Sequence, residues 1–283
     1  MTDDYSSSSE RTPKTGIDVT VPHAARVWNY WLGGKDNYAV DRKIGDEILA
    51  VFPAQAAIAR QSRAFLTRAV SYLASEAGIR QFLDIGTGLP TANNTHQVAQ
   101  RLAPESRIVY VDNDPLVLAH ARALLTSTPE GACDYIDADL HGPDTIIAEA
   151  ARTLDFTKPI AMILLGILGY VPDKDDPASI VARLMSRVPA GSYLVINDGT
   201  NVFHGRSEDD SIADSPRART VALYAKTGAI PYHLRTPEKI EGFFAGLELV
   251  DPGVVPVSLW RSATTPFGPP AEVDSFCGVG RKP

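Results

Sequence analysis

The chain has 283 residues, 44% of them hydrophobic and 22% charged. At roughly 100–200 residues per domain, it holds one large domain or two modest ones. The formal net charge of −7 argues against docking onto nucleic acid or an anionic membrane, because both are polyanions. Two isolated cysteines, Cys133 and Cys277, are too few for a disulfide framework or a thiolate zinc site. No apolar run reaches the ~20 residues that cross a bilayer, and the polar N-terminus lacks a signal-peptide pattern. These features predict a cytoplasmic protein without membrane or nucleic-acid partners.

The N-terminal part of the chain differs from the rest. Residues 1–16 hold four consecutive serines among charged residues and are expected to form a disordered tail, because they cannot bury enough apolar surface to offset the cost of ordering. Residues 17–80 are expected to form a helical cap and a helix that packs on a sheet. Two short helices and a long one, closed by Gly78, are predicted over 22–32, 41–52 and 54–77.

Residues 81–283 alternate short apolar runs with helical patterns, which is typical of right-handed βαβ units around a parallel sheet. Five runs have the length and aliphatic content of buried strands: 81–85, 107–111, 133–137, 160–165 and 193–197. Capping side chains before a proline predict helix starts at Asp114, Asp176 and Thr236. Three further runs, 248–250, 254–260 and 274–281, are predicted strands, the last two forming an antiparallel hairpin that closes the sheet edge. The predicted fold class is therefore α/β.

The strongest local signal follows the first predicted strand. Asp84 ends that strand, and the turn Gly86-Thr87-Gly88 comes directly after it. Glycines in such a turn let the backbone approach a ligand closely and adopt positive φ angles. The helix that follows offers free N–H groups at its start.

Acidic residues also end the next two predicted strands. Asp112 lies about 20 residues beyond the glycines, where a carboxylate accepts both hydroxyls of a ribose. Asp137 and Asp139 follow the third strand and are placed to accept from an adenine amino group. Because the carboxyl ends of parallel strands meet at one edge of a sheet, these acids are expected to line one ligand cleft. In the plainer interpretation, the glycine turn is a tight connection and each Asp caps a helix, with Asp112 and Asp114 competing for that role.

The charge of the cleft distinguishes between nucleotides. A dinucleotide site favours a third glycine where this chain has Thr91, and Asp84 would repel a pyrophosphate. S-adenosylmethionine carries an ammonium, a sulfonium, a ribose and an adenine but no phosphate. The acidic cleft therefore favours S-adenosylmethionine over a nicotinamide cofactor.

Two blocks of the sequence, ARVWNYWLGGKDNY over 25–38 and FLDIGTGLPT over 82–91, resemble the S-adenosyl methyltransferase family that was formerly catalogued as a domain of unknown function. The segments 254–261 and 278–283 match its C-terminal pattern, so the resemblance extends from about residue 17 to the end. It implies a Rossmann-like class I methyltransferase fold with a mostly parallel seven-stranded sheet, a C-terminal antiparallel hairpin, an N-terminal helical cap and S-adenosyl-L-methionine as cofactor. It implies no particular methyl acceptor.

The resemblance also implies which residues hold the cofactor. The methionine part would lie against the first strand end and its turn, at Asp84, Gly86, Thr87 and Gly88. Its amino group would meet the end of the fourth strand, at Leu165 and Gly166. The ribose would bind Asp112 and Asn113, and the adenine would bind Asp137, Ala138 and Asp139, with the choice between the two carboxylates open. Gly169-Tyr170 and Asn197-Asp198-Gly199 depart from the family pattern on the acceptor side.

The aromatic residues around Gly33-Gly34 have two interpretations. Trp28, Tyr30, Trp31 and Tyr38 form either the core of a small cap or a lid over the strand ends, where aromatic faces stabilise a sulfonium and a closed lid excludes water. As a lid, the cap would bring Arg26 and Asn37 to the cofactor carboxylate. Gly34 is counted with them at the cofactor site and is expected to supply only a backbone turn.

Methyl transfer from a sulfonium is an in-line displacement, so positioning does much of the catalysis. A general base is needed where the acceptor carries an acidic proton, and Tyr170, Asp198 and His204 are the candidates. In the alternative interpretation, His204 is a solvated loop residue. His96 is expected on the surface of a helix. The charged stretch 205–214 is expected to be a solvated loop, with a substrate gate as the alternative.

The leading hypothesis is an S-adenosylmethionine-dependent methyltransferase that acts on a small molecule. The alternatives are a non-catalytic sensor of the same nucleoside and, less favoured, an NAD(P)-dependent oxidoreductase. The sequence leaves the oligomeric state open.

Overall fold

The computed structural model describes residues 18–124, 126–203, 215–263 and 268–283. Three helices come first along the chain: α1 (Ala24–Trp31), α2 (Ala39–Val51) and the long α3 (Gln55–Ser75). The predicted tail, His204 and the charged stretch 205–214 lie outside the described residues. The prediction of a helical N-terminal unit is therefore confirmed for the part that the structure describes.

Strands and helices then alternate along the chain. The first five strands are β1 (Gln81–Ile85), β2 (Arg107–Asp112), β3 (Ala132–Asp137), β4 (Ala161–Leu165) and β5 (Tyr193–Gly199). The α-helices between and after them are α4 (Thr95–Leu102), α5 (Pro115–Leu124), α6 (Pro143–Ala150), α7 (Pro177–Ser186), α8 (Pro216–Ala225) and α9 (Pro237–Gly242). Two 3-10 helices, η1 (Leu168–Tyr170) and η2 (Asp173–Asp175), follow β4, and the C-terminal strands are β6 (Glu248–Leu249), β7 (Val255–Pro256) and β8 (Ser275–Arg281).

The strands form one sheet in the order β3-β2-β1-β4-β5-β8-β6, with β7 also paired to β8. Strands β1 to β5 pair in parallel, and β8 runs antiparallel to β5, β6 and β7. The sheet has eight strands rather than the expected seven, because the short β6 and β7 pair with successive parts of β8. The predicted strand over 254–260 is wrong in length, since only Val255 and Pro256 pair and the next residues form turns.

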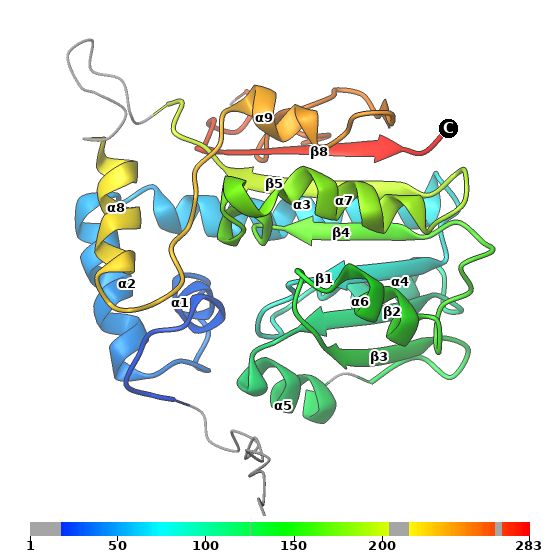
Figure 1. The fold of residues 1–283 in the computed structure, drawn as a ribbon, viewed down its shortest axis with the longest axis horizontal. Coiled ribbons are helices and arrows are strands. Elements are labelled where there is room, and N and C mark those ends of the chain that lie inside the picture. The colour runs from blue at the N-terminus through cyan, green and yellow to red at the C-terminus, as the bar shows by residue number, and fades with distance from the viewer. Residues whose placement is uncertain (1–17, 125, 204–214, 264–267) are drawn as a thin grey trace, which may run out of the picture.

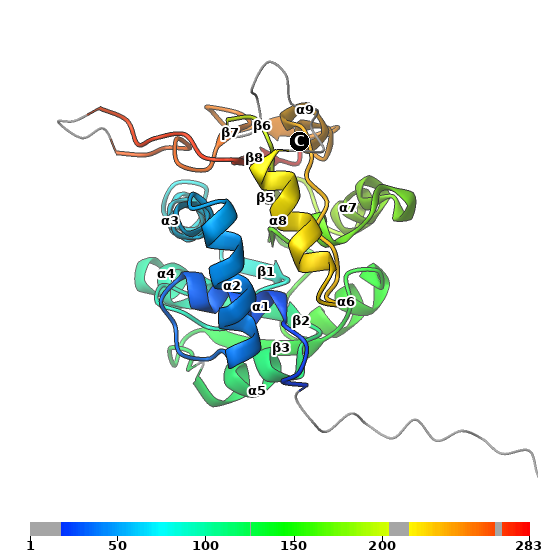
Figure 2. The same cartoon turned by 90° about the vertical axis from the view of Figure 1, so that its left-hand side faces the viewer.

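Helices cover both faces of the sheet. Helices α3 and α4 lie on one face and α6 and α7 on the other, as Figure 2 shows. The apolar stripe predicted for the long helix is buried against the first face, with Phe65, Ala69 and Val70 fully enclosed. Ile180, Val181 and Leu184 of α7 are buried against the second face. This α/β/α layering explains why β1 and β5 are buried along their whole length.

The predicted helix starts are confirmed by their capping bonds. Asp176 accepts from the N–H of Ser179 at 3.2 Å, and Thr236 accepts from that of Lys239 at 3.3 Å. Asp114 accepts from the N–H of Leu116 at 2.8 Å. The expectation of a surface position for His96 is wrong: this side chain is buried, and its Nδ1 lies 2.8 Å from the hydroxyl of Tyr110.

Helices α1, α2 and α8 lie beyond the carboxyl ends of the parallel strands, at the left of Figure 1. A buried ion pair joins the entry of α1 to α2, with Arg26 Nε 3.1 Å from Asp41 Oδ2. Asp41 also accepts from the N–H groups of His23 at 3.0 Å and Tyr38 at 2.8 Å. The N-terminal helices are thus fixed over the edge of the sheet where the acidic strand ends lie.

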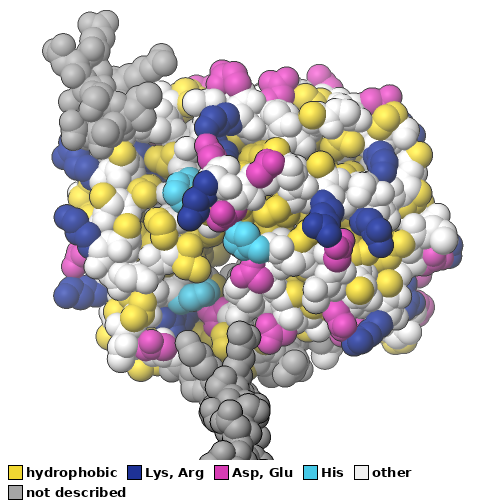
Figure 3. Space-filling model, in the orientation of Figure 1, with side chains coloured by type: hydrophobic (Ala, Val, Ile, Leu, Met, Phe, Trp, Pro, Cys, Tyr) yellow, Lys and Arg dark blue, Asp and Glu magenta, His cyan; other side chains and the backbone are white. Residues whose placement is uncertain are grey.

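The outer surface of the described residues mixes charged and apolar side chains. On the face drawn in Figure 3, histidine and acidic side chains lie next to one another near the middle. Within the part of the chain that the structure describes, every helix is too short or too polar to cross a bilayer.

Candidate cofactor and acceptor site

The turn after β1 needs glycine at two positions. Gly86 and Gly88 have φ angles of +74° and +64°, a region that side chains other than glycine rarely adopt. A Cβ on Gly86 would lie 2.6 Å from Cγ1 of Ile167, which follows β4. The N–H of Gly86 donates to the carbonyl of Val111 at 2.8 Å, and the hydroxyl of Thr87 contacts the carbonyl of Gly88 at 3.3 Å. The turn is therefore held between the ends of β2 and β4.

Asp112 is fixed by backbone donors from two directions. Its Oδ2 accepts from the N–H of Gly88 at 2.9 Å, and its Oδ1 accepts from the N–H of Asp114 at 3.0 Å. The side chain is 9% exposed, and burial raises its pKa. Since a carboxylate oxygen has more than one acceptor site, both oxygens keep capacity to bind a hydroxyl.

Asp84 lies deeper than Asp112. Its Oδ2 accepts from the hydroxyl of Thr95 at 2.6 Å, and the side chain is 7% exposed. Burial raises the pKa of Asp84 to about 6, while Thr95 and the nearby Arg63 act in the opposite direction. A buried carboxylate at the end of a central strand favours a cationic ligand nearby and disfavours a phosphate.

The end of β3 lies directly beside the end of β2, because Asp112 and Asp137 are Cα partners in the parallel register. Asp139 is occupied by Asn113, whose Nδ2 donates at 3.0 Å, and by His141, whose Nδ1 lies 2.6 Å away. Burial raises the pKa of Asp139, but the hydrogen bonds from His141 and Asn113 outweigh it and lower that pKa overall. The side chain of Asp137 is exposed and has no hydrogen-bond partner among the described residues. Ala138 links the two strand ends through its N–H, which donates to the carbonyl of Asp112 at 3.3 Å.

The end of the fourth strand, β4, adjoins unfilled space. Gly166 follows Leu165 with a φ of +70°, and no atom of the described residues lies within 4 Å of the position that a Cβ would take. Its N–H donates to the carbonyl of Asn197 at 2.9 Å. This bond holds the backbone of Gly166 at the neighbouring ends of β4 and β5. The free space at Gly166 is what a closely bound ligand requires.

The carboxyl ends of β1 to β4 and the glycine turn after β1 together form what we call the cofactor cradle. They fit S-adenosylmethionine. The hydrogen-bond acceptors there are a row of carboxylates with glycine backbone between them, which suits an ammonium, a ribose and an amino-substituted base. The space beside Gly88, where the atom nearest to an added Cβ is 3.9 Å away on Ala25, and the space beside Gly166 are both unfilled by protein. The cradle therefore matches a ligand that carries positive charge and no phosphate.

The three cap residues that we expected near the cofactor have other partners here. Arg26 Nη1 donates to the carbonyl of Asp18 at 2.8 Å, and its remaining nitrogens bind Asp41 and the carbonyl of Val21. Nδ2 of Asn37 donates to Oδ1 of Asn29 and to the carbonyl of Gly34, both at 2.9 Å. The guanidinium of Arg26, which we expected at the cofactor carboxylate, therefore binds groups within the cap.

Gly34 is needed for packing rather than for backbone freedom. A Cβ on this residue would overlap the side chain of Asn29, 2.3 Å from its Nδ2. The backbone N–H of Gly34 donates to the carbonyl of Asn29 at 2.8 Å. Glycine at this position therefore lets the Gly33-Gly34 turn close against α1.

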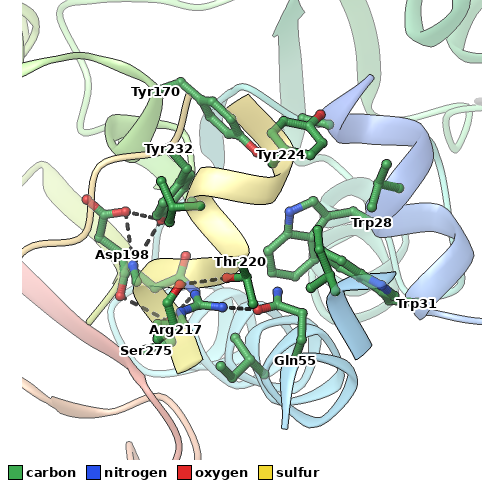
Figure 4. Close-up of a pocket in the computed structure, with 18 residues that line it drawn as sticks. Trp28, Trp31, Gln55, Tyr170, Asp198, Arg217, Thr220, Tyr224, Tyr232 and Ser275 are labelled. Carbon is green, nitrogen blue, oxygen red and sulfur yellow. Dashed lines mark hydrogen bonds between the residues drawn. The ribbon is translucent and has the colours of Figure 1, made fainter. Parts of the chain in front are cut away.

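A cavity of about 60 Å³ lies between the cap helices and the ends of β4 and β5; we call it the cap cavity (Figure 4). Aromatic rings form much of its wall: Trp28, Trp31, Tyr170, Tyr224 and Tyr232. Polar side chains complete it: Gln55, Asn197, Asp198, Arg217, Thr220 and Ser275. Gly166 lines the same cavity, so the cap cavity and the cofactor cradle share a wall.

Two of the three candidate bases line the cap cavity. Tyr170 packs edge-on against Tyr232 at 5.0 Å between ring centroids, and burial raises its pKa. Asp198 accepts from the hydroxyl of Tyr232 at Oδ1 and from Nη1 of Arg235 at Oδ2, the latter at 2.9 Å. It is 1% exposed, and burial raises its pKa.

Sequence reasoning missed Tyr232 and Arg217. Tyr232 fills space that two glycines leave: a Cβ on Gly169 would lie 2.1 Å from its ring, and one on Gly199 would lie 2.9 Å from it. The departures from the family pattern at Gly169 and Gly199 were the available signal, because paired small residues leave room for a large one. Arg217 comes from α8, whose position over the strand ends no local pattern predicts.

Fold and site together define a class I methyltransferase, since a mostly parallel sheet carries acidic strand ends around a glycine turn. The model of the S-adenosyl methyltransferase family matches residues 10–283, and the chain belongs to that family. It is accordingly an S-adenosylmethionine-dependent methyltransferase, and the cofactor prediction is confirmed.

Solved structures agree with this assignment. A DUF574 family protein from Streptomyces avermitilis is 43% identical with a TM-score of 0.88, over 95% of this chain and 100% of that one. A protein from Thermobifida fusca is 36% identical with a TM-score of 0.82, over 96% and 99%. An S-adenosylmethionine-dependent methyltransferase from Anabaena variabilis, 14% identical over 94% and 98%, shares the fold with a TM-score of 0.50. A search of curated proteins found no match.

Proposed function

We propose that this methyltransferase acts on a small molecule that binds in the cap cavity. The observation that carries the proposal is the place of the cavity: it adjoins Gly166 at the cofactor cradle and is covered by α1, α2 and α8. Its volume of about 60 Å³ is below the roughly 300–1,000 Å³ of ordinary ligand pockets, so entry of even a small acceptor requires movement of the cap. A polymer substrate would instead call for an open groove across the strand ends.

The cofactor would be held by the carboxyl ends of four strands. Asp112 would accept from the ribose hydroxyls, with Asn113 beside it, while the glycine turn and the end of β4 would contain the methionine part. Asp84 would favour the ammonium through its negative charge. Asp137 is the stronger candidate for the adenine amino group, because Asp139 already binds Asn113 and His141 while Asp137 is exposed and without a partner among the described residues.

The bound cofactor supplies an electrophilic methyl group on a sulfonium. The chain's own part is to align the attacking atom of the acceptor with that methyl and to exclude water. The cap rings Trp28 and Trp31, which pack edge-on at 5.8 Å, suit both tasks because they wall the cavity with apolar surface. Tyr170 would act as a hydrogen-bond donor at neutral pH, since its raised pKa keeps the phenol protonated.

Asp198 is better suited to positioning than to proton abstraction. Both of its oxygens already accept hydrogen bonds, from Tyr232 and Arg235. We therefore assign it the task of fixing Tyr232 in the cavity wall. The division into a tail over 1–16, a cap with its sheet-packing helix over 17–80 and a cofactor-binding domain over 81–283 is part of the same proposal, with the cap acting as the lid.

The test is transfer of a labelled methyl group from S-adenosylmethionine into the small-molecule fraction of a cell extract. Label in that fraction, lost with the variant Asp112→Ala, supports the proposal. Label that appears only in protein or nucleic acid contradicts it. Label that stays on the cofactor while the cofactor binds favours the non-catalytic sensor.

The nicotinamide alternative has its own readout. Calorimetric titration with NAD and with NADP should give no heat of binding, because Asp84 and Asp112 disfavour a pyrophosphate at the glycine turn. Binding of either nucleotide at micromolar concentration would favour the oxidoreductase.

A further inference from the structure

A buried positive charge in the wall of the cap cavity has no acidic partner among the residues that the structure describes. Arg217 is 6% exposed, and among the described residues no carboxylate lies within 4 Å of its guanidinium nitrogens. Its Nη1 donates to Oε1 of Gln55, and its guanidinium lies 5.2 Å from the centre of the Phe52 ring. Its Nε has no hydrogen-bond partner in the described part of the chain (Figure 4).

Two acidic side chains, Asp198 and Asp274, act electrostatically on Arg217, and both already bind other groups. Asp198 is paired with Arg235 at 2.9 Å. Asp274 accepts from the N–H groups of Val202 at 2.7 Å and Phe203 at 2.8 Å. Buried charges in proteins are normally paired, because removal of an ion from water is costly. Within residues 18–124, 126–203, 215–263 and 268–283, the guanidinium of Arg217 therefore lacks the compensating anion that its burial calls for.

A second unpartnered polar atom belongs to the same wall. Asn197 ends β5 and is 3% exposed, and its Nδ2 donates to the hydroxyl of Ser62 at 2.9 Å. Its Oδ1 has no partner among the described residues. Cavity-lining residues thus leave one charged donor and one acceptor unsatisfied, between aromatic rings that favour a flat apolar body.

We propose that the methyl acceptor is a small aromatic acid whose carboxylate binds Arg217 and whose hydroxyl or amino group faces the cofactor side of the cap cavity. This inference rests on the proposed function, since it names the acceptor class for the same site. An arginine fork binds a carboxylate through two parallel hydrogen bonds, which orients the ring as well as holding it. The unsatisfied oxygen of Asn197 would accept from the hydroxyl or amino group of the acid.

The experiment compares two probes of nearly the same shape, 4-hydroxybenzoate and 4-hydroxybenzamide, of which only the first carries a negative charge and two acceptor oxygens for an arginine fork. Each is titrated into the full-length protein saturated with S-adenosylhomocysteine, and binding is followed by calorimetry and ligand-observed NMR. Wild-type protein should bind the acid at least tenfold more tightly than the amide. Equal binding of the two, or no binding of the acid at millimolar concentration, overturns the proposal without any variant.

Variants then locate the anion. Arg217→Met should weaken binding of 4-hydroxybenzoate at least tenfold, leave the amide unchanged and change S-adenosylhomocysteine binding less than twofold. Arg219→Met, an exposed arginine on the same helix, is the matched control and should change none of these values. An equal loss of S-adenosylhomocysteine binding in Arg217→Met overturns the proposal, because the guanidinium would then serve the cofactor carboxylate.

The outcome is separable from that of the proposed function. If 4-hydroxybenzoate binds through Arg217 while no small molecule in the extract accepts label, the anion site stands and the proposed function fails. If label enters a small molecule that carries no acidic group, the proposed function stands and the aromatic-acid inference fails.

Discussion

The backbone N–H of Gly88 donates a hydrogen bond of 2.9 Å to the carboxylate of Asp112, 24 residues further along the chain. This bond ties the glycine turn after β1 to the acidic end of β2, so the two strand ends that we propose for the methionine part and the ribose are set relative to each other before any ligand binds. Preorganisation of this kind lowers the ordering cost of binding.

Replacement of Asp112 tests the ribose contact. Asp112→Ala removes a carboxylate that charge-assisted hydrogen bonds would use, so affinity for S-adenosylhomocysteine should fall by about 10- to 100-fold, at about 1.5–3 kcal/mol for such bonds. Calorimetry measures this change. Glu130→Ala removes an exposed carboxylate and is the control, with unchanged affinity expected. Wild-type affinity in Asp112→Ala would remove Asp112 from the cofactor site.

The cradle at Gly166 is tested by a single added methyl group. Gly166→Ala places a Cβ in space that no described atom occupies, so it should obstruct the cofactor and reduce its affinity at least tenfold. Gly246→Ala is matched, because Gly246 has a φ of +78° against +70° and the same empty surroundings. Both variants should lose similar stability from backbone strain, about 1 kcal/mol. If both bind the cofactor equally well, the cradle lies elsewhere.

Ionisation of Asp84 should make stability depend on pH. Burial raises the pKa of Asp84 from its ordinary value of 3.8 to about 6, so between these values the folded protein holds a proton that the unfolded chain releases. The contribution of Asp84 to the free energy of unfolding should therefore fall by about 2 kcal/mol as pH rises from 4 to 6 and change little above that. Urea unfolding across this range measures the slope.

The variant Asp84→Asn isolates this contribution. It keeps an acceptor for the Thr95 hydroxyl but cannot ionise, so its unfolding free energy should fall less with pH than that of the wild type. S-adenosylmethionine should bind the wild type more tightly above pH 6 than below it, since the ionised carboxylate attracts the ammonium. Parallel pH profiles for the two proteins would show that Asp84 does not titrate in this window.

The buried pair of Arg26 and Asp41 should control the stability of the cap. Asp41→Ala leaves the guanidinium of Arg26 buried without its anion, which costs about 3–5 kcal/mol. The double variant Arg26→Met with Asp41→Leu should recover much of that loss. Asp46→Ala, which removes an exposed partner of Tyr30 on the same helix, should cost less than 1 kcal/mol. Urea unfolding that gives equal losses for Asp41→Ala and Asp46→Ala would contradict this role.

Strand positions were predictable because they depend on local pattern. The run at β1 was predicted with its observed bounds, and Asp112 and Asp137 were placed at neighbouring strand ends that the register then pairs. The prediction of a surface position for His96 was wrong, because a single polar residue on a short helix gives no sign of a buried partner. That partner is the hydroxyl of Tyr110 in the core.

The fold class, the acidic strand ends and the glycine turn could be predicted from the chain alone, because each arises from residues close together in it. Which side chains already have partners and which remain available depends on contacts that form only in the folded protein. Arg26 pairs with Asp41 within the cap, while Arg217 of α8 faces the strand ends and has no acidic partner in the part of the chain that the structure describes. The partners of a side chain depend on its neighbours in space, and these come from distant segments: Arg217 donates to Gln55, 162 residues away in the chain.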